Sequence, residues 1–209
     1  MNNYILDAAK RELLIMLLII LFCIYYKNKI VIITMILLLL ILIFFYRGWN
    51  NNIEIQNNYL YCPCEGKILN INENKKNIHI SIFLNIHNIH VQYAPINGKI
   101  KEIKYIKGTF KPAYFFEKSK YNERKITTIE SEFGDIKLYQ IAGQIARRIK
   151  VFKNIGDKIN ALEPFGLIKF GSRCDLIIPK NNFILNKNLK INQKIRIGDI
   201  IGNYNYISI

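Results

Sequence analysis

The sequence is poor in the cysteine and histidine patterns that mark metal-binding proteins. It has only four cysteines and three histidines. The closest cysteine pair lies in Cys62-Pro63-Cys64 and is a C-x-C, whereas zinc sites usually show C-x₂₋₄-C or H-x₃₋₅-H elements. His87 and His90 would complete a set of four ligands, but we favour reduced, structural thiols and predict no metal site.

Acidic residues are also scarce, at 15 against 30 lysines and arginines, which gives a formal net charge of +15. Residues 1–50 carry +3 of this charge, so the rest of the chain carries +12. Charge of this sign suits an anionic lipid surface, at about 1 kcal/mol per well-placed cation, or a nucleic acid. Because no nucleic-acid motif accompanies the charge, we predict a membrane and no nucleic acid as the partner.

Long apolar runs are confined to the N-terminus. Residues 13–26 and 30–46 are almost wholly apolar, and each run is somewhat shorter than the roughly 20 residues that span a bilayer comfortably. No small-residue cleavage site follows them, which disfavours a cleaved signal peptide. We predict that residues 1–50 form a hydrophobic membrane anchor, a hairpin of two short helices over 13–26 and 30–46. One span plus an interfacial helix is the alternative, and the flanking charges leave the orientation open.

The chain after the anchor shows short β-rich runs broken by Gly, Asn and Pro, with clear strand patterns at 78–84 and 137–141. A proline lies three residues upstream of Gly66 and of Gly98, and β-branched residues follow each glycine. Gly156 and Gly198 each precede an aspartate between such residues. Glycine tolerates positive φ, so we interpret all four as turn residues. The fold class predicted for 51–209 is mainly β and barrel-sandwich-like, as in lipoyl-type domains.

One stretch carries chemistry: residues 165–175 read FGLIKFGSRCD. A serine after glycine can attack the carbonyl before it, because glycine has no side chain to block the approach. For Gly171-Ser172 this attack would turn the amide into an ester, and β-elimination would leave dehydroalanine, which hydrolyses to a pyruvoyl group. A Gly-Ser pair alone is far more often a simple turn, so the surrounding residues must decide.

Those surroundings closely resemble the short, membrane-linked class of phosphatidylserine decarboxylase proenzymes. Positions 166–175 and Pro179 match the processing-site signature G-L-I-x-F-G-S-R-x-D-x-x-x-P. Further family-like motifs follow the same order along the chain, and the resemblance covers roughly residues 59–202. These are the S-I-F-L at 81–84, the N-I-H-V at 88–91 with Ala94-Pro95, the G-T-F-x-x-A at 108–113, the N-E-R at 122–124 and the Q-I-A-G-x-I-A-R-R-I at 140–149.

The resemblance implies an activity and a cofactor. The proenzyme would cut itself at Gly171–Ser172 into residues 1–171 and 172–209, which stay associated, and Ser172 would become a covalent pyruvoyl group. That group forms a Schiff base with the headgroup amine of phosphatidylserine and acts as the electron sink for loss of CO₂, which yields phosphatidylethanolamine. Neither a metal nor a diffusible cofactor is required.

Site roles follow from the same resemblance. His90 is the candidate base for the Ser172 hydroxyl, with Glu65 as its orienter, in the manner of a nucleophile–base–orienter triad. The alternative for His90 is a hydrogen-bonded core imidazole. One of Arg147 and Arg148 is predicted to bind the lipid phosphate or carboxylate, because a guanidinium suits bidentate contact with either.

The sequence also departs from the family pattern. Glu65 and Asn88 stand where the family has Asp, Tyr93 replaces a second histidine of long members, and R-D-P reads Arg47-Gly48-Trp49. These departures support an alternative: an unprocessed, membrane-tethered barrel-sandwich module that binds anionic lipid or a partner protein. A pyruvoyl decarboxylase for another amine is a third possibility. The expected location is a bacterial-type cell membrane, or an inner organellar membrane in a eukaryote, with the catalytic domain at the lipid surface.

Overall fold

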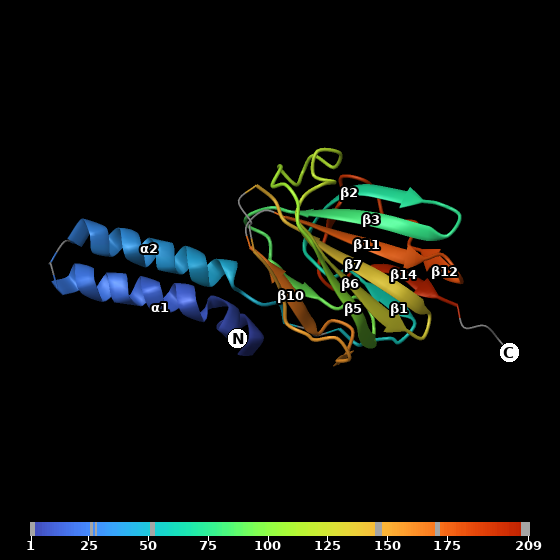
Figure 1. Ribbon diagram of the computed structural model, residues 1–209, viewed down its shortest axis with the longest axis horizontal. Coiled ribbons are helices and arrows are strands. Elements are labelled where there is room, and N and C mark those ends of the chain that lie inside the picture. Colours follow the sequence, from blue (N-terminus) through green and yellow to red (C-terminus); the bar gives the residue numbers. More distant parts are fainter. Residues whose placement is uncertain are drawn as a thin grey trace. The chain divides into compact units, whose positions relative to one another are not determined.

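The structure is a computed structural model that describes residues 3–25, 27, 29–50, 53–144, 148–169 and 172–205. The chain divides into two compact units, Met1–Trp49 and Asn50–Ile209 (Figure 1). The first unit is helical and the second is built of strands. The prediction of a mainly β domain preceded by two helices is therefore confirmed.

The N-terminal unit consists of α1 (Asn3–Tyr25) and α2 (Lys29–Phe45), which pack against each other on either side of Lys27, a residue with a φ of 54°. The second helix lies close to the predicted 30–46. The first helix begins at Asn3, so the prediction that it starts at residue 13 is wrong. The apolar run does not mark where the helix begins. The preceding Ala, Lys, Arg and Glu residues are strong helix formers and extend it. Within the described ranges, neither helix combines the length and apolar character needed to cross a membrane.

The described residues of unit 2 form three antiparallel sheets. Their strand orders are β1-β14-β12, β4-β10-β8 and β13-β2-β3-β11-β7-β6-β5-β9. The barrel-sandwich arrangement stays a prediction. The strand bounds are β1 Tyr59–Tyr61, β2 Gly66–Glu73, β3 Asn77–Leu84, β4 Val91–Tyr93, β5 Gly98–Ile106, β6 Arg124–Ser131, β7 Gly134–Ile141, β8 Ile149–Val151, β9 Lys158–Ile159, β10 Pro164–Ile168, β11 Ser172–Pro179, β12 Phe183–Leu185, β13 Lys194–Ile195 and β14 Ile200–Tyr204.

The large sheet has a mostly apolar face and a more polar face, because successive side chains of a strand point to opposite sides. On the apolar face, Cys174 and Leu176 of β11 join the hydrophobic core together with Ile80 and Ile82 of β3. The intervening residues of β11 are Arg173 and Asp175, and both are nonetheless buried. Both faces of β11 are therefore covered, one by the core and one by a polar cluster.

The register aligns one end of five strands of this sheet. Cα partners run from Ile106 of β5 through Arg124, Ile141 and Arg173 to Phe83 of β3. The yellow-green segment 107–123 leaves β5 and returns to β6 at this end (Figure 1). Ser172 precedes Arg173, so the processing strand begins at the same end of the sheet.

The four glycines that looked alike in the sequence do two different jobs. Gly156 and Gly198 have φ values of 93° and 86° and are turn residues, as predicted. Gly66 and Gly98 instead begin β2 and β5, so their interpretation as turn residues is wrong. A Cβ on Gly66 would lie 2.3 Å from the Phe83 carbonyl oxygen, so the close approach of two backbones requires glycine there.

Candidate active site

Ser172 is the first residue of β11, a strand held between β3 and β7 in the large sheet. It pairs with Leu84, the last residue of β3, and is fully buried. Its Oγ has no hydrogen-bond partner among the residues that the structure describes. A buried hydroxyl is normally hydrogen-bonded, so one without a partner requires an explanation. Gly171, the other half of the predicted scissile bond, lies outside the described residues.

His90 lies at the end of the segment that connects β3 to β4. It is fully buried, and its Nδ1 is 2.8 Å from the Asn88 carbonyl oxygen. Because that oxygen can only accept, Nδ1 carries the hydrogen when the ring is neutral, and Nε2 is the nitrogen that can accept a proton. This is the tautomer that a general base needs.

Strand pairing brings the histidine segment to both sides of the predicted cleavage site. At one end of the segment, Leu84 pairs with Ser172. At the other end, the backbone N–H of Ile168 donates to the His90 carbonyl over 3.3 Å. The chain on both flanks of the cleavage site is therefore bonded to the two ends of the segment that carries His90.

The Glu65 carboxylate holds this segment through two hydrogen bonds. Its Oε1 accepts from Asn88 Nδ2 over 2.8 Å, and its Oε2 accepts from the Ile89 backbone N–H over 3.2 Å. Asn88 in turn supplies the carbonyl that fixes His90 Nδ1. The structure thus shows a route by which Glu65 can orient His90, through the backbone of the segment.

The same contacts explain two departures from the family pattern. Two carboxylates at positions 65 and 88 would repel each other unless they shared a proton. Here the carboxylate of Glu65 meets the amide of Asn88, which donates to it without any proton sharing. The two changes are therefore complementary, and the longer Glu side chain still reaches its partner.

A pair of buried glutamines, not predicted from the sequence, supports the other side of His90. Gln92 Nε2 donates to the His90 carbonyl over 2.5 Å, and Gln140 Nε2 donates to Gln92 Oε1 over 2.8 Å. Gly166 makes room for this pair, because a Cβ there would lie 2.7 Å from Gln140 Nε2. The Q of Q-I-A-G and the first G of the processing signature thus meet in space, which no spacing rule reveals.

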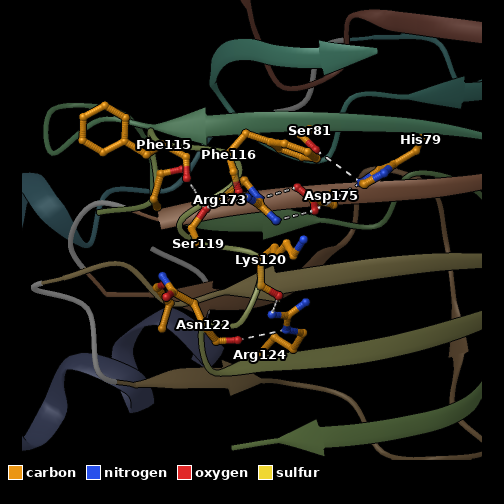
Figure 2. Close-up of polar contacts among 12 residues, drawn as sticks. His79, Ser81, Phe115, Phe116, Ser119, Lys120, Asn122, Arg124, Arg173 and Asp175 are labelled. Atoms are coloured by element: carbon orange, nitrogen blue, oxygen red, sulfur yellow. Dashed lines mark hydrogen bonds and ion pairs between the residues drawn. The ribbon is translucent and has the colours of Figure 1, made fainter. Parts of the chain in front are cut away.

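On the opposite face of β11, Arg173 forms a buried ion pair with Asp175 (Figure 2). Arg173 Nη2 donates to Asp175 Oδ2 over 3.0 Å, and Nε lies 2.9 Å from Oδ1. His79 Nε2 is 3.2 Å from Asp175 Oδ2 and 3.3 Å from Ser81 Oγ. The R-x-D of the signature is therefore a structural element, with His79 at its partly exposed side.

Arg173 also holds the 107–123 segment. Its Nη1 donates to Ser119 Oγ over 2.6 Å and to the Phe116 carbonyl over 3.1 Å, and its guanidinium carbon lies 4.8 Å from the centre of the Phe116 ring (Figure 2). Nearby, burial and then the charge of Arg173 lower the pKa of Arg124. The second residue after the predicted cleavage site thus ties the processing strand to a segment more than fifty residues upstream.

The remaining predicted site residues are placed only in part. Arg148 has an exposed side chain, and its carbonyl accepts from the Lys169 backbone N–H over 3.2 Å, near the predicted cleavage site. Arg147 lies outside the described residues. His87 is exposed in a turn of the histidine segment. Within the described ranges, no group of three or more His, Cys, Asp or Glu residues could hold a metal ion.

Fold and site together define a class of protein: a β domain in which a buried serine, whose hydroxyl has no hydrogen-bond partner among the described residues, begins a central strand, and a buried histidine lies in the segment that follows the neighbouring strand. Comparison with known sequences makes the class specific. A family model described as phosphatidylserine decarboxylase matches residues 41–203. The chain belongs to the phosphatidylserine decarboxylase family, which confirms the resemblance found in its motifs.

Curated relatives carry two kinds of name. A protein of Methanosarcina acetivorans named as an archaetidylserine decarboxylase proenzyme is 42% identical over 134 residues, 64% of this chain and 62% of the relative. Phosphatidylserine decarboxylase proenzymes of Parabacteroides distasonis and Ehrlichia chaffeensis are 37% and 43% identical, over 64% and 58% of this chain and 63% and 58% of the relatives. The chain thus spans less than two thirds of each of these relatives.

Proposed function

We propose that this chain is a carboxy-lyase proenzyme that cuts itself between Gly171 and Ser172 and then decarboxylates phosphatidylserine to phosphatidylethanolamine. The observation that carries the proposal is the Ser172 hydroxyl, which is buried without a hydrogen-bond partner among the described residues. Membership of the family supports the reaction class. The relatives' names, archaetidylserine and phosphatidylserine decarboxylase proenzymes, share a serine headgroup, which supports the substrate class.

Maturation begins when Ser172 Oγ attacks the Gly171 carbonyl carbon. His90 takes the hydroxyl proton at Nε2, the C–N bond breaks, and an ester C–O bond forms while the new amine gains a proton. Removal of the Ser172 Cα proton then breaks the Cβ–O bond, so Gly171 leaves as a carboxylate and residue 172 becomes dehydroalanine. Water hydrolyses its imine tautomer, which releases ammonia and leaves the pyruvoyl group at the N-terminus of the small chain.

The architecture supports association of the two products. Residues 172–209 contain β11, which lies between β3 and β7, and also β13 and β14, which pair with β2 and β1 of the large chain. Core residues such as Cys174 and Leu176 of β11 are fully buried. Cleavage at the start of β11 breaks none of this pairing, so the fragments remain one folded unit.

For the decarboxylation itself, the pyruvoyl carbonyl supplies the electron sink that loss of CO₂ from an α-amino acid requires. The chain's own residues hold the substrate around it. One of Arg147 and Arg148 binds the lipid phosphate or carboxylate. The N-terminal helices hold the domain at a membrane, of bacterial type or of an inner organelle, so that the lipid substrate is supplied from the surface.

The test is intact-mass analysis of purified full-length protein. Two chains, residues 1–171 and 172–209, are expected, with a blocked N-terminus on the small one. Ser172→Ala is expected to stay uncut. Ser131→Ala, which removes a hydroxyl from the β6–β7 turn, is the matched control and is expected to mature normally. A wild-type chain that stays intact with lipid present would refute the proposal and favour the unprocessed lipid-binding module.

A further inference from the structure

Residues 104–121 of the β domain carry an unusual group of exposed aromatic side chains, which we name the aromatic–lysine lobe. The exposed fractions are 54% for Tyr105, 51% for Tyr114, 45% for Phe115 and 69% for Tyr121. Elsewhere in the described part of this domain, the exposed large hydrophobic residues are all isoleucines: Ile53, Ile86, Ile155, Ile184, Ile191 and Ile200. A concentration of exposed aromatic surface at one place indicates an interaction site.

The charge of the lobe has one dominant sign. Its lysines are all exposed and outnumber its single acid, Glu117, so the lobe has a net charge of +4. Two of the cations lie over exposed rings, with Lys118 Nζ 4.7 Å from the centre of Phe115 and Lys120 Nζ 5.3 Å from that of Tyr121. The lysines are Lys104, Lys107, Lys111, Lys118 and Lys120.

The lobe that exposes these rings is held in place by buried hydrogen bonds. Asn122 is fully buried and donates to the carbonyls of Lys111 and Ala142 over 2.7 and 2.8 Å. Ser119 is also fully buried, and its hydroxyl accepts from Arg173. The polar side chains of Ser119 and Asn122 are turned inward to hold the lobe (Figure 2), while the four exposed rings and the lysines are left outside.

The lobe also emerges at the end of the sheet where the processing strand starts. Ile106, which lies in the lobe, and Arg124, which begins the next strand, lie in the same register row as Arg173. Tyr114 makes an edge-to-face contact with Phe83, the Cα partner of Arg173, with ring centres 5.9 Å apart. Whatever the lobe binds is therefore brought to the end of the sheet at which Ser172 lies.

We propose that the aromatic–lysine lobe docks onto an anionic lipid bilayer and presents the Ser172 end of the sheet to the membrane surface. Tyr and Phe rings favour the boundary between headgroups and acyl chains. Lysines near an anionic surface strengthen binding by roughly fivefold each. The exposed rings and lysines of the lobe, with a single acidic residue among them, therefore suit the surface of a bilayer that contains anionic lipids. This inference deepens the proposed function by assigning the domain its own contact with the membrane.

The test uses the depth of a fluorescent reporter in the full-length chain. Trp49, the only tryptophan, is replaced by Phe, and Tyr114→Trp or Phe115→Trp places a single reporter in the lobe. Ile155→Trp is the matched control, because Ile155 is 63% exposed. It lies beside Gly156, whose backbone N–H donates to the carbonyl of Ile100, near the end of β5 that is opposite the lobe. Vesicles contain dibrominated phosphatidylcholine, with or without phosphatidylglycerol, which is anionic but lacks the serine headgroup.

Strong quenching of either lobe reporter is expected with phosphatidylglycerol present, and little quenching of the Ile155→Trp control. Lys111→Gln, Lys118→Gln and Lys120→Gln together are expected to weaken lobe binding by about 100-fold, from three cations at roughly fivefold each. Absence of quenching for both lobe reporters, or quenching equal to that of the control, would overturn the inference. Quenching that is the same without anionic lipid and in high salt would refute an anionic surface as the partner.

The same measurement on the Ser172→Ala chain separates this inference from the proposed function. An uncut chain has no pyruvoyl group, yet its lobe is unchanged, so lobe quenching is expected to persist. If wild-type protein matures and decarboxylates while its lobe stays unquenched, the lobe inference alone fails. If the lobe is quenched while wild-type protein never matures, the proposed function alone fails.

Discussion

The two faces of β11 bury very different chemistry within a few residues of each other. One face carries Ser172 and Cys174, which are neutral and lie against the apolar core. The other carries Arg173 and Asp175, an ion pair that is also buried and that is covered by the 107–123 segment. A strand alternates its side chains, so a single sequence can place the serine that we propose to react on one face and its structural support on the other. The comparison teaches that burial alone does not separate reactive from structural residues.

Breaking the ion pair on the polar face should produce the largest effect on stability. Arg173→Met leaves Asp175 buried beside His79 without its main cation, so a loss of about 3–5 kcal/mol in the free energy of unfolding is expected. Urea unfolding in the Ser172→Ala background measures it on an uncut chain. Lys101→Met is the control, because Lys101 and Asp135 form a half-exposed pair worth at most about 1 kcal/mol. Equal losses in the two variants would show that the buried pair is no more important than a surface one.

Removing the proposed base should produce the largest effect on maturation. His90→Ala is expected to slow self-cleavage by about 100-fold or more, the usual result of losing a general base. The rate is measured as the fraction of cut chain over time. His87→Ala, in the same segment but exposed, is expected to mature normally. Similar slowing by both changes would mean that the segment acts through folding and that His90 is not the base.

Substitution of Glu65 tests whether this residue acts by positioning His90. Glu65→Gln keeps one acceptor oxygen but places an amide against the amide of Asn88, so the histidine segment is held less well. Slowing of about tenfold is expected, because misplacement of a catalytic group by a fraction of an ångström already costs rate. Adding Asn88→Asp should restore part of the rate by exchanging the acid and amide between the two positions. A double variant slower than Glu65→Gln alone would argue against this pairing.

The smallest expected effect is on the pH dependence of stability, through a cysteine on the apolar side of the sheet. Burial, together with neighbouring Cys174 and Cys62, raises the pKa of the Cys64 thiol, so the folded chain favours the protonated thiol. The stability that this contributes is complete below the thiol's pKa in the unfolded chain, near 8.5. It falls as pH rises further, by at most about 1.4 kcal/mol per pH unit. Cys64→Ala is expected to flatten this decline in urea unfolding, and an unchanged slope would exclude Cys64 as its source.

Much of the site was readable from local patterns. The strand patterns at 78–84 and 137–141 correspond to β3 and to part of β7, because alternation of apolar residues reports the burial of one face directly. The processing signature marks Ser172, which the structure places at the start of a buried strand. His90 was separable from His87 by motif, and the structure separates them by burial.

Other features of the site had no local signal. Gln92 and Gln140 support His90 only because β4 and β7 bring their side chains together across the core. The two kinds of glycine also looked alike, since close backbone approach depends on the partner strand and not on the glycine's neighbours. The predicted start of α1 is wrong because helix propensity, and not the apolar run, determines where that helix begins.

What the sequence by itself determined is the chemistry available: the Gly171-Ser172 pair, the histidine, the basic charge and the alternation that makes the domain mainly β. These depend on residue identity and on spacing of a few positions, which the chain carries with it into any fold. Only the tertiary structure decided that Arg173 holds the aromatic–lysine lobe, that Glu65 reaches Asn88, and that Ser172 starts a strand bonded to the histidine segment. Each of these contacts joins residues 23 to 88 positions apart, and antiparallel register across the large sheet brings them together.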